Sequence, residues 1–350
     1  MYVALLFAIL AVIAVLAFFE DEEMQSRGWL LMALAIVLTL YVAFRPEGID
    51  KDYNAYLGYF RNSTGVSASL TEPTFKMING IARALQAPIL LFVIYAFLAV
   101  PLKIYAIKRL SPYWYLSIML WVTHLFIIQE MTQIRVAVAS GVFLFALPFL
   151  AEGKKMKYLL LAVVALFFHY SALVLLPLAI FGNKDLSRFF RCILVVVPIL
   201  IYAFPFAGMD LLKLIPIPLL QQKLQMYEEL KIYEGGMWAD INIYNALALI
   251  RLATYYILLW KYDYLKDKYP YMPILLKVFC YSICMYVGLS FLPPVAMRIE
   301  ELIAIIDCVT FPFLAVLLRP HWLGRLLVVL YAICVLVANI FLYKLLKLGM

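Results

Sequence analysis

Long apolar runs, separated by short charged clusters, follow one another along nearly the whole chain. Most of these runs approach the length of about 20 residues that an α-helix needs to cross the hydrocarbon core of a bilayer. A soluble domain is about half apolar, whereas 67% of the residues here are hydrophobic and 14% are charged. A soluble fold could not bury so much apolar surface. The sequence therefore excludes a soluble enzyme and predicts a polytopic integral membrane protein.

The pattern predicts an all-α membrane helix bundle of about 11–12 membrane segments in a single transmembrane domain, residues 1–350. Two hydrophilic stretches, residues 45–87 and 207–240, interrupt the apolar runs as loops. We expect a lateral helix over Glu72–Leu85 in the first loop and an amphipathic interfacial stretch over Leu219–Tyr233 in the second. The expected helices are at residues 2–19, 28–44, 88–107, 112–130, 131–151, 156–168, 169–182, 186–206, 241–261, 272–292, 295–318 and 322–346.

Lysine and arginine concentrate in short loops, and such loops usually face the cytoplasm. The net charge of +8 is spread over these clusters rather than along a basic stripe, so we expect no nucleic-acid partner. The clusters are Lys103-Lys108-Arg109, Lys154-Lys155-Lys157, Lys184-Arg188-Arg191, Lys261-Lys266-Lys268 and Arg319-Arg325.

All five clusters lie on one side only if residues 156–182 enter the membrane and return as two short helices, with a hinge near His169. Each half would then span about 20 Å at a rise of about 1.5 Å per residue. The alternative is one ordinary span over residues 156–180. The paired arrangement places a shared set on the outer side: residues 45–87, the Gln129–Arg135 turn, His169, residues 207–240 and Arg298.

Two arginines in apolar surroundings are candidates for phosphate binding. Arg135 precedes an uninterrupted apolar helix, and Arg298 follows Pro293-Pro294. A guanidinium matches phosphate oxygens bidentately and keeps its charge, which suits a pyrophosphate on the outer side. The alternatives are an interfacial Arg135 that extends to lipid headgroups and a local ion pair of Arg298 with Glu300 or Glu301.

His169 lies between apolar residues on both sides. A lone histidine in a helix is often a packing residue. The functional alternative is a proton acceptor or phosphate ligand, because imidazole exchanges protons near neutral pH.

The outer loop after the second apolar run combines carboxylates, basic residues and aromatic rings. Asp52 could accept a proton from a sugar hydroxyl, and tyrosine rings offer flat surfaces to sugars. Asp50 and Asp52 could also hold a metal ion or form a plain solvated loop, and we expect catalysis without a metal. Glu72-Pro73 has the composition of a helix start, where capping alone would explain the acid.

The order and spacing of these residues resemble the EpsG family of Wzy-type polysaccharide polymerases over roughly residues 40–300. The segment from Ile134 through Pro177 is the most specific part. One departure is that Val136 follows the motif arginine, where the family often has glutamine. The matching positions are Arg45, Asp52-Tyr53 and Tyr56, Glu72-Pro73 and Phe75, Ile134-Arg135, Phe168-His169 with Ser171-Ala172-Leu173, and Ala296 with Arg298.

The resemblance implies a bacterial inner-membrane glycosyltransferase with a GT-C-like helix bundle. Such an enzyme would polymerise undecaprenyl-pyrophosphate-linked oligosaccharides into O-antigen, capsule or exopolysaccharide, with its active site facing the periplasm or outside. A chain-length regulator, flippase or export machinery would be possible partners. The expected catalytic residues are Asp52, Arg135, His169 and Arg298, and the expected substrate-binding residues are Arg45, Tyr53, Tyr56 and Glu72.

Three other functions remain open at this point. A polysaccharide ligase would use the same donor and similar arginines with another acceptor. A membrane acyltransferase would reach its donor from inside, which the outward placement of the candidate residues disfavours. A lipid-linked oligosaccharide flippase or transporter is the non-enzyme alternative, although transporters commonly carry internal repeats and none is visible here.

Overall fold

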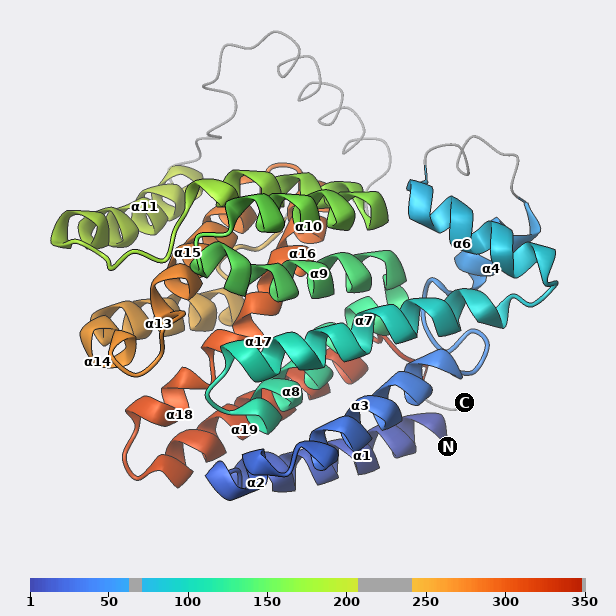
Figure 1. Ribbon diagram of the computed structural model, residues 1–350, viewed down its shortest axis with the longest axis horizontal. Coiled ribbons are helices and arrows are strands. Elements are labelled where there is room, and N and C mark those ends of the chain that lie inside the picture. The colour runs from blue at the N-terminus through green and yellow to red at the C-terminus, as the bar shows by residue number, and fades with distance from the viewer. Residues whose placement is uncertain (63–70, 207–240, 348–350) are drawn as a thin grey trace, which may run out of the picture. The chain divides into compact units, whose positions relative to one another are not determined.

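A computed structural model describes residues 1–62, 71–206 and 241–347 (Figure 1). The described residues form helices and no β-strand, and an isolated bridge joins Asp50 to Leu346. The expected all-α class is therefore confirmed. The chain divides into two compact units, Met1–Gly182 with Ile305–Met350 (unit 1) and Asn183–Ala304 (unit 2). The expectation of one transmembrane domain stays a prediction.

Unit 1 is a layered set of antiparallel helices in which apolar faces pack on their neighbours. Stacked rings of Tyr2 and Tyr41 join the first long helix to the second. Helix α7 (Ile89–Leu110), which contains Lys103, packs between α3 (Gly28–Ala43) and α9 (Ile134–Ala151). The helices are α1 (Tyr2–Phe18), α2 (Glu22–Ser26), α3 (Gly28–Ala43), α4 (Tyr53–Arg61), α6 (Pro73–Ala84), α7 (Ile89–Leu110), α8 (Trp114–Thr123), the π-helix η1 (Phe126–Thr132), α9 (Ile134–Ala151), α10 (Lys155–Phe168), the 3₁₀-helix η2 (Tyr170–Ile180), η5 (Ala304–Ile306, at the boundary), α17 (Asp307–Thr310), α18 (Phe313–Leu317), α19 (His321–Val337) and the π-helix η6 (Ala338–Leu342).

The expected hinge near His169 is present. His169 is extended (φ −154°, ψ 124°) between α10 and η2, and the two helices pack on each other. The hydroxyl of Tyr158 donates to the carbonyl of Leu175 across the pair at 2.8 Å. This bond joins positions on opposite sides of the break, so η2 folds back on α10 rather than continuing it.

Unit 2 is a smaller group of helices. Its helix α15 (Met272–Gly288) packs on α11 (Arg188–Phe206), α13 (Ala246–Trp260) and α16 (Pro293–Ile303). An asparagine cap starts its second helix, because the side chain of Asn245 accepts from the Ala248 amide at 3.0 Å. The expected interfacial stretch Leu219–Tyr233 lies outside the described residues. The helices are α11 (Arg188–Phe206), α13 (Ala246–Trp260), α14 (Tyr262–Lys266), α15 (Met272–Gly288) and α16 (Pro293–Ile303).

Two sequence predictions are corrected. The apolar run 295–318 is not one span but the short helices α16, η5, α17 and α18, and Pro312 directly precedes the last of them. Proline lacks an amide hydrogen and disfavours a continuous helix at such a position. Lys103 does not belong to a surface cluster with Lys108, since it is fully buried inside unit 1.

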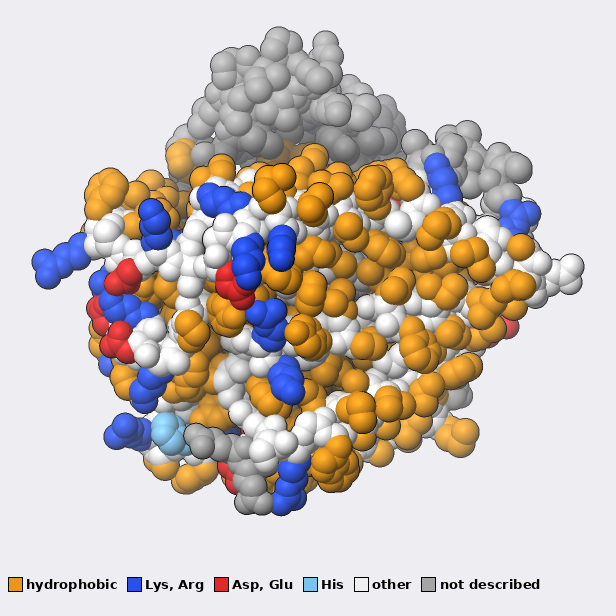
Figure 2. All heavy atoms as spheres, in the orientation of Figure 1, with side chains coloured by type: hydrophobic (Ala, Val, Ile, Leu, Met, Phe, Trp, Pro, Cys, Tyr) orange, Lys and Arg blue, Asp and Glu red, His pale blue; other side chains and the backbone are white. Residues whose placement is uncertain are grey.

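Within the part of the chain that the structure describes, four helices are long and apolar enough to cross a membrane, namely α7, α9, α11 and residues His321–Leu342. Six shorter apolar helices of 10–17 residues accompany them there. Figure 2 shows apolar side chains over most of the visible surface. Large exposed side chains such as Trp29, Phe97 and Leu160 would be unfavourable in water. The protein is therefore a membrane protein whose outer surface suits lipid.

Candidate functional site

Three chain segments of unit 1 converge on the carboxylate of Glu72. Glu72 occupies the N-cap position of α6 in an extended backbone conformation, and its side chain makes no capping hydrogen bond there. Arg135 lies in the first turn of α9, and His169 is the break between α10 and η2. One carboxylate oxygen (Oε1) lies 2.9 Å from Nδ1 of His169, and the other (Oε2) forms an ion pair with Nη1 of Arg135. The Thr74 hydroxyl donates to the carbonyl of Phe167 at 2.6 Å and fixes α6 to the end of α10.

The ion pair and hydrogen bond determine the charges in this cluster. Burial alone raises the pKa of Glu72, but the hydrogen bond from His169 and the charge of Arg135 outweigh it and lower that pKa from 4.5 to about 2. An ionised carboxylate only accepts hydrogen bonds, so Nδ1 of His169 carries the proton. The other ring nitrogen, Nε2, is buried and has no hydrogen-bond partner among the described residues. In the neutral tautomer with the proton on Nδ1, the lone pair of the imidazole lies at Nε2.

Acid should weaken the fold through Glu72. The unfolded chain takes up this proton near the ordinary pKa of 4.5, whereas the folded site resists protonation down to about 2. Stabilisation by the ionised carboxylate is thus complete above about pH 4.5 and is lost as the pH falls toward 2. We expect the thermal midpoint of purified protein to fall across this window, and to fall less steeply in Glu72→Gln.

The matched control is Glu47→Gln, which removes an exposed glutamate from the segment that precedes α4. It should keep the acid dependence of the wild type. If Glu72→Gln and the wild type lose stability in parallel, the ionised Glu72 is not the stabilising group.

Arg45 and Asp50 form a second, fully buried ion pair, with Nε of Arg45 3.0 Å from Oδ2 of Asp50. The guanidinium also lies over the ring of Phe92, 4.3 Å from its centroid. The chain end is tied to the same loop, because the Lys347 amide donates to the carbonyl of Ile49 at 3.0 Å. A further bond runs from Lys51 Nζ to the carbonyl of Tyr343 at 3.2 Å. These contacts hold the loop in one conformation.

The two loop tyrosines are buried rather than offered to a ligand. Tyr53 stacks on Phe92 with centroids 4.5 Å apart, and Tyr56 packs against Phe75 at 5.9 Å. Burial raises the pKa of Tyr56 to about 12, so it is a neutral phenol near Arg135. Arg45, Tyr53 and Tyr56 were expected to bind substrate, but their geometry fits holding the loop better than holding a sugar.

Asp50 and Asp52 have different surroundings. Asp52 is half-buried at the start of α4, and its amide donates to Oδ1 of Asp50 at 3.0 Å. The carboxylate of Asp50 already faces Arg45. No cluster of three or more His, Cys, Asp or Glu side chains suited to a metal occurs within the described ranges.

Arg298 lies in unit 2, on the exposed face of α16. The alternative to phosphate binding was an ion pair of Arg298 with Glu300 or Glu301, and no such pair occurs in the described part of the chain. Glu300 pairs instead with Arg251, whose Nη1 lies 2.8 Å from Oε1 of Glu300. The structure thus brings Glu72, Arg135 and His169 together in unit 1 and leaves Arg298 as an exposed cation of unit 2.

Two further buried ion pairs of the described residues involve cations that the sequence analysis did not single out as site candidates. Lys103 on α7 pairs with Glu130 of η1, and its Nζ donates to Oε1 of Gln129 at 2.6 Å. Arg251 lies in the middle of α13. A single charged residue inside an apolar run was the available signal, since such a residue in a membrane helix requires a partner.

Comparison with known proteins gave one family. The sequence model of the EpsG family matches residues 28–348. No curated protein matches the chain. No solved structure matches it either.

Proposed function

Because the chain belongs to the EpsG family, whose members are membrane proteins of the polysaccharide-polymerase type, we propose that it joins undecaprenyl-pyrophosphate-linked oligosaccharide repeat units into a surface polysaccharide. The reaction takes place at the outer face of the bacterial inner membrane. A flippase, a chain-length regulator and export machinery are the partners that such a reaction would need.

The observation that carries this proposal is the shared carboxylate of Glu72, which orients a cation and an imidazole side by side. The side chain of Arg135 is 23% exposed while that of Glu72 is 3% exposed. Arg135 can therefore contact a ligand while Glu72 holds it in place. A fixed guanidinium in poorly hydrated surroundings stabilises developing negative charge more than water does.

The reaction is a single displacement. A sugar hydroxyl of the acceptor attacks the anomeric carbon of the growing chain, a new glycosidic bond forms, and the bond from that carbon to the pyrophosphate oxygen breaks. Undecaprenyl pyrophosphate leaves as an anion and is stabilised by Arg135. Arg298, in unit 2, stays a separate candidate for binding a phosphate. We expect inversion at the anomeric carbon, and product NMR showing retention would contradict this mechanism.

His169 is the proposed base, with Asp52 as the competing residue. The Nδ1–H of His169 donates to Glu72, so Nε2 is the free acceptor for the hydroxyl proton. Glu72 itself is a poor base, because its pKa of about 2 leaves it little affinity for a proton. The carboxylate then has the role of orienting the imidazole and fixing its tautomer, as in carboxylate–histidine pairs of hydrolytic triads.

The direct test is polymer synthesis by purified protein in lipid nanodiscs with one synthetic undecaprenyl-pyrophosphate repeat unit. A ladder of products on a gel is expected. A single transfer to a different acceptor would indicate a ligase. Movement of the substrate across vesicles without any ladder would indicate a transporter and would overturn the proposal.

A further inference from the structure

We propose that Arg251 is a positioning residue: its ion pair with Glu300 fixes the rotation of α16 and so presents Arg298 on the exposed face of that helix. The inference rests on the proposed function for the role of Arg298, but its structural part can be tested separately. Every contact that it uses lies within unit 2.

Arg251 joins three helices at once. From α13, its Nη1 lies 2.8 Å from Oε1 of Glu300 on α16, and its Nη2 donates to the hydroxyl of Ser282 on α15 at 2.9 Å. The guanidinium also lies 6.0 Å from the ring centroid of Phe279. Arg251 is 7% exposed. A guanidinium held in this way has fixed donor directions, so it also fixes the carboxylate that it binds.

Because residues are regularly spaced around an α-helix, anchoring Glu300 also determines the direction in which Arg298 points. Residues on an α-helix are about 100° apart, so positions 298 and 300 are about 200° apart and point to opposite sides. The inner face of α16 contains Ala296, Ile299 and Ile303, and Glu300 lies at the edge of this stripe. Holding Glu300 inward therefore turns Arg298 outward, as the structure shows.

Apolar contacts alone would fix this rotation less well. Helix α16 is 11 residues long and starts with two prolines, and its inner stripe is made of small and aliphatic side chains. Such contacts have little directionality, whereas an ion pair with two hydrogen-bonded arginine nitrogens accepts one geometry. Buried ion pairs are weak evidence of stability but can specify one arrangement among several. In this protein, the arrangement that the ion pair specifies is the rotation of α16 about its own axis.

The test uses Arg298→Cys as a reporter in the full-length protein. Reaction with a maleimide is followed by peptide mass, which separates the introduced thiol from the five native cysteines. The introduced thiol should react readily with Arg251 and Glu300 intact. In the Arg251→Met/Glu300→Leu background, where two apolar side chains replace the ion pair, its reaction should slow several-fold. Arg251→Lys, which keeps the charge, should restore part of the rate.

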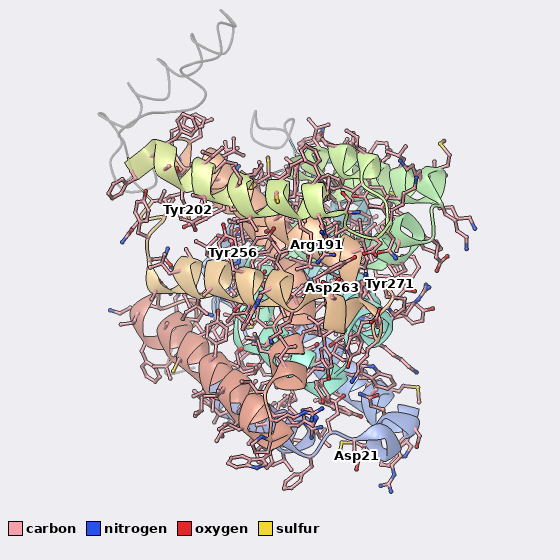
Figure 3. All side chains as sticks on the ribbon, turned by 90° about the vertical axis from the view of Figure 1, so that its left-hand side faces the viewer. Asp21, Arg191, Tyr202, Tyr256, Asp263 and Tyr271 are labelled. Atoms are coloured by element: carbon pink, nitrogen blue, oxygen red, sulfur yellow. The ribbon has the colours of Figure 1, made fainter. Side chains whose placement is uncertain are left out.

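The control pair is Arg191 and Asp263, which face each other between α11 and α14 with Nη1 of Arg191 2.6 Å from Oδ2 of Asp263 (Figure 3). The side chains of this pair are 30% and 63% exposed, against 8% and 18% for Arg251 and Glu300. Arg191→Met/Asp263→Asn should therefore leave the reaction of the introduced thiol unchanged. Thermal unfolding of each variant shows whether it is folded.

The outcomes separate the two proposals. An unreactive thiol in the Arg298→Cys protein with the ion pair intact, or an equal rate in the apolar double variant, overturns the positioning role. Slower labelling in the double variant supports the positioning role of Arg251, whether or not wild-type protein makes polymer. If wild-type protein makes no polymer, only the proposed function is rejected. If both proposals hold, Arg251→Met/Glu300→Leu with Arg298 present should make polymer about 10²-fold more slowly, as expected for a misplaced binding group.

Discussion

Arg135→Ala is expected to reduce the rate of polymer formation by about 10²–10³-fold, the usual effect of removing one group that stabilises a developing anion. The guanidinium is held by Glu72 and lies 5.2 Å from the ring centroid of Phe75, so its position is fixed before substrate binds. Arg135→Lys keeps the charge but loses the planar fork. It should therefore recover only part of the rate.

The measurement is the product ladder from purified protein at saturating repeat unit, with initial rates taken from the first extension product. Arg109→Ala is the matched control, because Arg109 also pairs with a glutamate, Glu152, at 3.1 Å, but on an exposed surface of unit 1. It should behave as wild type. Equal rates for Arg135→Ala and Arg109→Ala would remove Arg135 from the mechanism.

Lys103→Met is expected to destabilise the protein by about 3–5 kcal/mol, the cost of leaving one partner of a buried ion pair uncompensated. The side chains of Lys103 and Glu130 are fully inaccessible. The lysine stem also fits beside Gly141, where an added Cβ would approach Lys103 Cγ to 3.3 Å. The loss should appear as a lower unfolding midpoint in detergent.

Lys103→Met/Glu130→Leu should recover most of this stability, because it removes both charges and fills the space with apolar atoms. Lys108→Met is the control on the same helix, since Lys108 is exposed and its Nζ lies 5.0 Å from the ring centroid of Trp114. Its effect should be small. A single Lys103→Met variant as stable as the wild type would show that Glu130 does not need the lysine.

Apolar periodicity and charge placement were sufficient to predict most of the helices. The runs at 28–44, 131–151 and 186–206 agree with α3, α9 and α11 to within a few residues at their ends. The hinge at His169 followed from the distribution of lysine and arginine alone. Glu72 was expected at a helix start, and it directly precedes α6, although its side chain does not cap the helix.

The remaining features depend on tertiary contacts that hydropathy does not encode. Lys103 looked like part of a basic cluster because Lys108 and Arg109 follow it, and only its distance from Glu130 shows a buried ion pair. Arg251 was hidden in an apolar run in the same way. The sequence suggested Arg135, His169 and Glu72 as separate candidates, but not that one carboxylate contacts the other two.

The ties between residues 49–51 and 343–347 have a consequence for biogenesis. Lys51 and Tyr343 are 292 residues apart in the chain, so translation and membrane insertion of all the intervening helices must precede their contact. Until then the segment containing Arg45 and Asp52 lacks one of its supports. A nascent chain with its early helices already inserted would therefore hold this loop without full support until residues 343–347 have been added.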